Sequence, residues 1–149
     1  MIRPATEADI PRLIELGQAM HEESPEYRGI SYDPEKVGST LKALINGAGV
    51  IFAYERSGEI HGALAGWIEE FWFSREKQAG DFALFVDPEY RNGLIAVKLA
   101  LAFHSWAHLL GARRVQMGIT TGVHADATGR LYRSLGMQDS GLLFQKDFS

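Results

Sequence analysis

The segment from Val86 to Ala96 has the residue types and the spacing of a phosphate-binding turn. Strand-forming residues end at Val86, and a short loop containing Pro88 and Gly93 leads directly into a strongly apolar helical stretch. The first N–H groups of such a helix lack partners within it, and the helix dipole adds partial positive charge. A pyrophosphate would be stabilised by both effects. A glycine at the start of a buried helix also serves packing alone, so this segment leaves both interpretations open.

Carboxylates at expected strand ends are the candidates for removing a proton from a substrate. Asp81 is expected to open one strand, and Glu69 and Glu70 to close the strand before it. Burial would raise the pKa of such a carboxylate toward neutrality, as a general base requires. Strand ends are also charged simply because they are solvated. We name Asp81 and Glu69 as candidate bases and leave the choice between them open.

Hydrophobic periodicity and turn residues predict the elements that position these side chains. The Ser57-Gly58 pair is expected to form a hairpin turn, and the strand, helix and strand that follow have the order of a right-handed parallel crossover. After an N-terminal strand, the predicted helices lie at residues 6–20, 33–46, 92–110 and 126–135. The further predicted strands lie at 50–54, 60–68, 81–86 and 114–120, with one or two more within 141–148.

The order of these elements predicts an α/β fold, with a central mixed sheet that is mostly antiparallel and is flanked by helices. The 149 residues, 46% of them hydrophobic, suffice for one core, and no linker or repeat interrupts them. We therefore predict a single domain over residues 1–149.

The segment Val86-Asp87-Pro88-Glu89-Tyr90-Arg91-Asn92-Gly93-Leu94-Ile95-Ala96 resembles the acetyl-coenzyme A motif of GNAT acetyltransferases. In that family a strand ending in Val-x-Pro-Glu-x-Arg leads into Arg-x-x-Gly-x-Gly/Ala at a helix start. This chain departs from the pattern at Leu94, which stands where the family has its first motif glycine, with Gly93 one position early. The start of the chain, Ile2 to Ile10, also looks like the common opening of the family.

A second resemblance lies at Leu131-Tyr132-Arg133-Ser134-Leu135-Gly136-Met137, which is similar to the family's Leu-Tyr-x-x-Leu-Gly-Phe. The match assigns Tyr132 to the tyrosine whose hydroxyl lies near the sulfur and can donate a proton to the leaving thiolate. The family often has an asparagine where this chain has Ala125, and His124 or Asp126 could take its place. Without the motif, Tyr132 would read as a core residue of an amphipathic helix.

The resemblance implies a GNAT-like fold whose parallel strand-helix-strand unit forms the site for acetyl-CoA, the co-substrate. It also implies that the fourth strand parts from the fifth and pairs with the pantetheine arm through its backbone. The implied cofactor-binding residues are Phe85, Val86, Arg91, Asn92, Gly93, Leu94, Ile95, Ala96, Val97 and His124. The implied activity is N-acetyl transfer to a primary amine, carried by a small molecule or a peptide. The alternative is a GNAT-fold module that binds an acyl-CoA or a partner protein without turnover.

Composition excludes several other classes of function. The chain has no cysteine, so disulfides and thiolate chemistry are absent, and the cytoplasm is the expected location. We expect no bound metal, no nucleic-acid partner and no membrane association, because ligand spacings, basic clusters and long apolar runs are missing. The net charge is −4, with most acidic residues before position 91. Aromatic residues near Trp67 to Phe73 could line an acceptor pocket, form a homodimer face or pack in the core.

Overall fold

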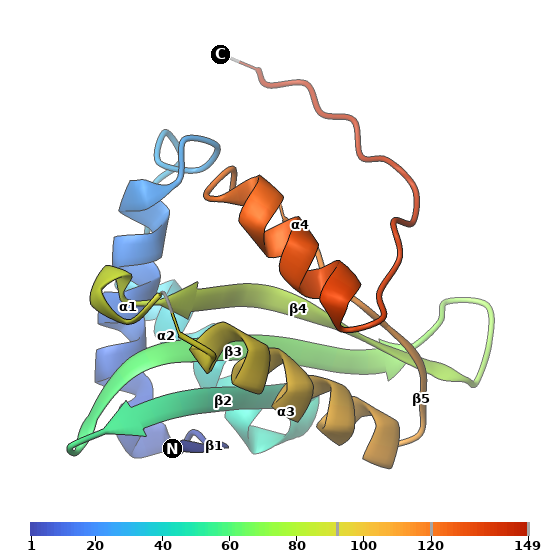
Figure 1. Ribbon diagram of the computed structural model, residues 1–149, viewed down its shortest axis with the longest axis horizontal. Helices are drawn as coiled ribbons and strands as arrows, with labels where there is room; N and C mark the ends of the chain where they lie inside the picture. Colours follow the sequence, from blue (N-terminus) through green and yellow to red (C-terminus); the bar gives the residue numbers. More distant parts are fainter. Residues whose placement is uncertain (92, 120, 149) are drawn as a thin grey trace.

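The computed structural model describes residues 1–91, 93–119 and 121–148, and Figure 1 shows a central sheet covered by helices on both faces. Short 3₁₀ turns lie at Glu7–Asp9 and Pro88–Tyr90, and a π-helical turn lies at Leu44–Ala48. The strands are β1 (Ile2–Pro4), β2 (Gly49–Arg56), β3 (Glu59–Glu70), β4 (Lys77–Val86) and β5 (Ala112–Gln116). The helices are α1 (Ile10–Glu23), α2 (Pro34–Ala43), α3 (Ile95–Leu109) and α4 (Ala125–Ser134).

The five strands form one sheet in the order β1-β2-β3-β4-β5. The first four strands pair antiparallel with their neighbours, whereas β4 and β5 are parallel and are joined through α3. The β2–β3 hairpin turns at Ser57 and Gly58, both with positive φ, as the tight turn predicted there requires. The predicted α/β fold with a mixed, mostly antiparallel sheet is therefore confirmed.

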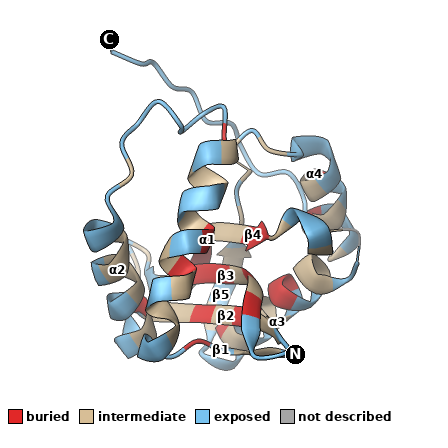
Figure 2. Cartoon of the chain, turned by 90° about the vertical axis from the view of Figure 1, so that its left-hand side faces the viewer, coloured by how far each residue is buried: buried red, intermediate tan, exposed pale blue. Residues whose placement is uncertain are grey.

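Two apolar clusters lie on opposite faces of the sheet. One joins α1 to the sheet through Leu13, Leu16, Ile51 and Phe85 among others. The other joins α3 to the sheet, and Leu99, Phe103 and Ala107 of α3 are fully buried in it. Figure 2 shows the buried residues on the strands and on the helix faces that meet them. Helices α1 and α3 thus pack on opposite faces of β4, the strand that carries Asp81 and Val86.

The edge between β4 and β5 is paired over only part of its length. The parallel register runs from Lys77 opposite Ala112 to Gly80 opposite Gln116 and ends there. Just beyond, β4 skips one residue against β3, because Asp81 lies opposite Gly66 and Ala83 opposite Ala65. This β-bulge at Phe82 bends the strand, as bulges beside active sites commonly do. Residues 81–86 of β4 therefore have β3 on one side and an open edge on the other.

The main differences from the elements expected from the sequence lie in β4, in β5 and in the residues after α4. Strand β4 begins at Lys77, four residues before Asp81, because its first half pairs with both neighbours. Strand β5 covers residues 112–116 instead of 114–120; residues 117–119 are not in a strand, and Thr120 lies outside the described residues. The expected terminal strands within 141–148 do not form, and Leu142, Leu143 and Phe144 are exposed on an extended tail (Figure 1).

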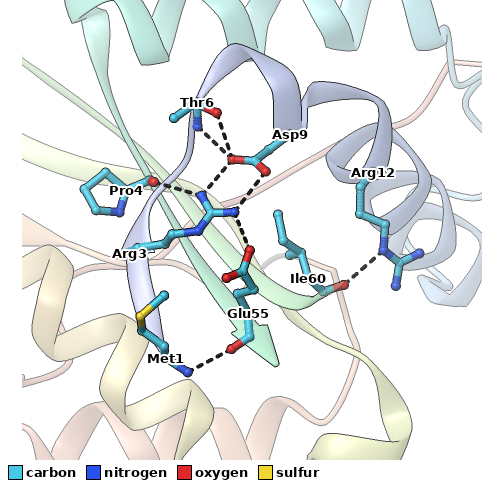
Figure 3. A network of polar contacts seen from close by, with 8 residues as sticks. All are labelled: Met1, Arg3, Pro4, Thr6, Asp9, Arg12, Glu55 and Ile60. Carbon is cyan, nitrogen blue, oxygen red and sulfur yellow. Dashed lines mark hydrogen bonds and ion pairs between the residues drawn. The ribbon is translucent and has the colours of Figure 1, made fainter. Parts of the chain in front are cut away.

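An ion-pair network fastens β1 to the start of α1 (Figure 3). The Arg3 guanidinium donates two hydrogen bonds to Asp9, at 2.8 and 3.0 Å, and one to Glu55 of β2 at 2.9 Å. The same Asp9 carboxylate accepts from the backbone N–H of Thr6 at 2.8 Å. The hydrogen bond from Arg3 lowers the pKa of Asp9 to about 2. This network links β1 and β2 to the residue just before α1.

Replacing Asp9 with asparagine is expected to destabilise the protein at pH 7 by about 2 kcal/mol, because the folded state binds the ionised carboxylate through Arg3. Since the pKa of Asp9 is lower in the folded state, its stabilisation is present above about pH 4 and is lost as the pH falls toward 2. The melting temperatures of the wild type and Asp9→Asn should therefore converge in acid. The exposed Glu15, changed to glutamine, is the control and should cost little at any pH. A constant gap between pH 7 and pH 2 would contradict this account.

Candidate active site

A cleft of about 440 Å³ opens along the free edge of β4. Its walls come from β4, the end of α1, the start of α3, the segment after β5 and one face of α4. On α4, Thr128, Leu131 and Tyr132 share this face because residues three and four apart lie together on a helix. The polar and charged side chains of the lining are Glu23, Asp81, Arg91, Thr121, His124, Thr128 and Tyr132.

The backbone groups that face the cleft follow from strand alternation. The N–H of Asp87 donates to the carbonyl of His61 on β3 at 2.8 Å, so the peptide groups of residue 87 point toward β3. In an antiparallel pair alternate residues point the same way, which directs the groups of Phe85 toward β3 as well. The backbone groups of Leu84 and Val86 therefore face the open edge. Phe85 and Val86 were the residues predicted to pair with the pantetheine arm. The peptide groups of Val86 face the open edge, but those of Phe85 face β3, and the second residue that faces the open edge is Leu84.

Asp81 lies in the cleft, immediately after β4 loses its pairing with β5. Its Oδ1 accepts a hydrogen bond from the backbone N–H of Gly118 at 3.1 Å, which leaves Oδ2 for other partners. Burial raises the pKa of Asp81 to about 6, against a smaller opposite effect of that hydrogen bond. A carboxylate with this pKa can both take up and release a proton near neutral pH.

Tyr132 lies in the same cleft and is 7% exposed. Burial raises the pKa of its phenol well above the usual value, and the negative charge of Asp81 raises it further. The hydroxyl therefore stays protonated at neutral pH. The structure thus brings together Asp81 and Tyr132, two of the three residues predicted to be catalytic, with one suited to accept a proton and the other to donate one.

Arg91 holds the walls of the cleft together. Its guanidinium makes a bidentate ion pair with Glu23 of α1, with both contacts at 2.7 Å, and its Nε donates to the carbonyl of Val86 at 2.7 Å. The hydrogen bonds from Arg91 lower the pKa of Glu23. Since these contacts occupy both terminal nitrogens and Nε, Arg91 positions α1 against the end of β4. Its predicted contact with a cofactor is therefore limited to the two N–H groups that these three bonds leave.

The start of α3 borders the cleft at Ala96. The first hydrogen bond of the helix runs from the N–H of Lys98 to the carbonyl of Leu94, so the N–H groups of Ile95, Ala96 and Val97 precede it. Leu94 has φ −92° and ψ 11°, a backbone conformation that does not require glycine, and its side chain is 65% exposed. The leucine thus fits the motif without strain. The predicted contribution of Asn92 lies outside the described residues.

The model of the acetyltransferase (GNAT) family matches residues 16–137. The chain belongs to this family. The prediction of an N-acetyltransferase is thereby confirmed at the level of the family. No protein of curated function matches the sequence closely enough to count as a relative.

Solved structures of the family have the same fold. A variant of the BH1408 protein from Bacillus halodurans has a TM-score of 0.81 and 20% identity, over 100% of this chain and 99% of that one. The aminoglycoside acetyltransferase meta-AAC0020, from an uncultured soil metagenomic sample, has a TM-score of 0.77 and 22% identity, over 100% and 96% of the chains. The aminoglycoside acetyltransferase HMB0005, from a sample of the same kind, has a TM-score of 0.76 and 19% identity, over 100% and 98%. At these identities the likeness establishes the fold alone.

Glu69 and the aromatic residues of the β3–β4 hairpin do not join the cleft. Glu69 is exposed opposite Gln78, three residues beyond the partner of Asp81, which is roughly 10 Å along the strand. Trp67 packs against the α1 core, and Trp72 is 95% exposed at the hairpin tip. His124 does border the cleft, in the left-handed conformation that begins α4. Asp81 is therefore the better placed of the two predicted bases.

Sequence reasoning missed several residues that shape the cleft. Glu23 lies 68 positions from Arg91, and no motif links the two. Ser24 is fully buried, and its hydroxyl donates to the carbonyl of Thr121 across 97 positions, which ties the end of α1 to the segment before α4. Leu84 was missed because backbone direction depends on register. These contacts between distant parts of the chain leave no periodic signal in the sequence.

Replacing Asp81 with asparagine is expected to raise the melting temperature at pH 7.5, because the folded state no longer holds a charged carboxylate in a buried place. The pKa of Asp81 is higher in the folded state, so its contribution to stability falls as the pH rises from about 4 through 6. The two proteins should therefore melt alike near pH 4. Glu69→Gln is the control and should change nothing. A variant less stable than the wild type at pH 7.5 would show that the ionised Asp81 is structural.

Proposed function

We propose that this chain is an acetyl-CoA-dependent N-acetyltransferase that acetylates a primary amine. The observation that carries the proposal is that Asp81 and Tyr132 line one cleft beside the unpaired edge of β4. Burial raises the pKa of Asp81 in the sense that a base working near neutral pH needs. The raised pKa of Tyr132 keeps the phenol protonated, so its role is to donate a hydrogen bond to the developing thiolate and not to act as a strong acid.

The residues of the cleft fit acetyl-CoA, which would supply the acetyl group as a thioester. The outward-facing peptide groups of Leu84 and Val86 can pair with an extended amide-bearing arm as a further strand would. The N–H groups of Ile95, Ala96 and Val97 precede the first helical hydrogen bond found among the described residues, and such groups suit a pyrophosphate. The Val86 carbonyl is already bound to Arg91, so the N–H of Val86 is the group left to polarise a carbonyl oxygen.

Asp81 would take the proton from the amine on Oδ2, since Oδ1 is held by the N–H of Gly118. Above about pH 6 this carboxylate is ionised and ready to act. Tyr132 would donate the hydrogen of its hydroxyl toward the sulfur that leaves. Its environment favours the protonated phenol, so this hydrogen is present throughout the working pH range.

Incubation with acetyl-CoA and a panel of amines and peptides should release CoA and acetylate at least one amine. With that amine, kcat should rise about tenfold per pH unit below pH 6 and level off above it, following the pKa of Asp81. Asp81→Asn should lower kcat by roughly a hundredfold or more and remove this pH dependence. Tight binding of acetyl-CoA without CoA release from any amine would favour the non-catalytic module instead.

Tyr132→Phe keeps the ring and its packing but removes the hydroxyl. Turnover should fall by roughly a hundredfold, because a thiolate leaves poorly without a proton donor. The affinity for acetyl-CoA and the melting temperature should change little. Both are measured on the same preparation, by calorimetry and by thermal unfolding. Full turnover in the folded variant would show that Tyr132 is a packing residue, and equal losses of affinity and rate would show that it positions the cofactor.

A further inference from the structure

A second cavity, of about 290 Å³, lies between α1, α2 and the face of the sheet. It adjoins the cleft, and the two share the lining residues Met20, Phe82, Ala83, Phe85 and Thr121. The bulged residue Phe82 is one of those between them. A molecule seated in this cavity would therefore lie next to the part of the cleft that holds Asp81.

The walls of this cavity are mainly apolar, and three of their hydroxyl groups already donate to backbone carbonyls. The Tyr32 hydroxyl donates to the carbonyl of Ile14 at 2.8 Å, and the Thr40 hydroxyl donates to that of Lys36 at 3.1 Å. The buried Ser24 hydroxyl donates to the carbonyl of Thr121. The remaining surface comes largely from aliphatic side chains and from the rings of His21 and Tyr32, whose centroids are 5.3 Å apart. The buried Nε2 of His21 has no hydrogen-bond partner among the described residues, so the cavity offers a bound molecule this nitrogen and few other polar groups.

The charge of the cavity is unfavourable for a polycation. Among the described residues no aspartate or glutamate lines it, and its one permanently charged lining residue is Lys36, on α2. The acids of the adjoining cleft are engaged, since Glu23 is paired with Arg91, and Asp81 faces the reacting amine. An ammonium group buried here would lose its hydration without gaining a carboxylate, which is costly.

We propose that this cavity binds the body of the acceptor, and that the acceptor is a monoamine carried on a compact aryl or branched alkyl group. The inference rests on the proposed function, because it assumes that the amine reaches Asp81 from this side. Burying such an apolar group against apolar walls is favourable. Its one amino group would lie in the cleft in the unprotonated form. An aminoglycoside or a polyamine would place further cationic groups against Lys36 and the apolar walls. This chain therefore differs in acceptor from the neighbours named as aminoglycoside acetyltransferases.

The first experiment compares matched acceptors with acetyl-CoA as donor. The pair is 2-phenylethylamine and its analogue with a second aminomethyl group at the para position, with spermidine and kanamycin alongside. We expect kcat/KM for 2-phenylethylamine to exceed that of each polyamine at least tenfold. A preference for spermidine or kanamycin would overturn the inference while leaving acetyl transfer itself established.

The second experiment changes the cavity and leaves the cleft intact. Val37 lines the cavity but not the cleft, so Val37→Trp should raise KM for 2-phenylethylamine at least tenfold and leave KM for acetyl-CoA unchanged. Ser39→Trp, an exposed position on the same helix, is the matched control and should behave as the wild type. Lys36→Glu, also exposed, should raise kcat/KM for the diamine several-fold, because it replaces repulsion with attraction.

A measurement of amine binding distinguishes failure of this inference from failure of the proposed function. If no amine is acetylated, calorimetric binding of 2-phenylethylamine that is lost in Val37→Trp would still support the cavity as an amine site. Absence of binding to the wild type would overturn it. The inference would also be overturned if Val37→Trp left the amine KM unchanged but reduced the use of acyl-CoAs longer than acetyl-CoA, since the cavity would then hold the acyl chain.

Discussion

The loss of pairing between β4 and β5 after Gly80 is the constraint on which the active cleft depends. A strand normally satisfies its N–H and C=O groups on both sides, and an unpaired edge invites another extended chain. Here the edge over residues 81–86 is open but bordered by α4 and by the segment after β5, so it forms the floor of a cleft. The β-bulge at Phe82 lies just after the last residue of β4 that pairs with β5. The separated strands thus create both the binding edge and the room beside it.

Hydrogen bonds between distant segments hold this cleft open in a defined shape. Asp81 binds the N–H of Gly118 across the gap, Arg91 joins Glu23 to the Val86 carbonyl, and Ser24 joins α1 to Thr121. Each contact satisfies a polar group that would otherwise be costly to bury. Since Arg91 and Glu23 neutralise each other, their pair shapes the wall without adding a large net charge. Asp81 has no such cationic partner among the described contacts, and its pKa rises accordingly.

Burial affects the two neighbouring cavities differently. In the cleft it raises the pKa values of Asp81 and Tyr132, so Asp81 becomes a usable base while Tyr132 keeps its hydroxyl hydrogen. In the cavity between α1 and α2 it acts on walls that are mainly apolar, with the Nε2 of His21 as a buried polar atom. The cleft is therefore suited to proton transfer and the cavity to selection by shape and apolar contact.

No helix among the described residues is long and apolar enough to cross a membrane.

The sequence by itself determined the order of the elements as far as α4, the hairpin at Ser57-Gly58 and the family, because these depend on local turn chemistry, periodicity and short motifs. It also singled out Asp81 and Tyr132. Tertiary structure alone decided that Asp81 lies in the cleft and Glu69 outside it, that Leu84 and not Phe85 turns its peptide groups to the open edge, and that Arg91 is tied to Glu23. The physical reason is that strand register, burial and ion pairing join residues far apart in the chain, and no local pattern records which of them will meet.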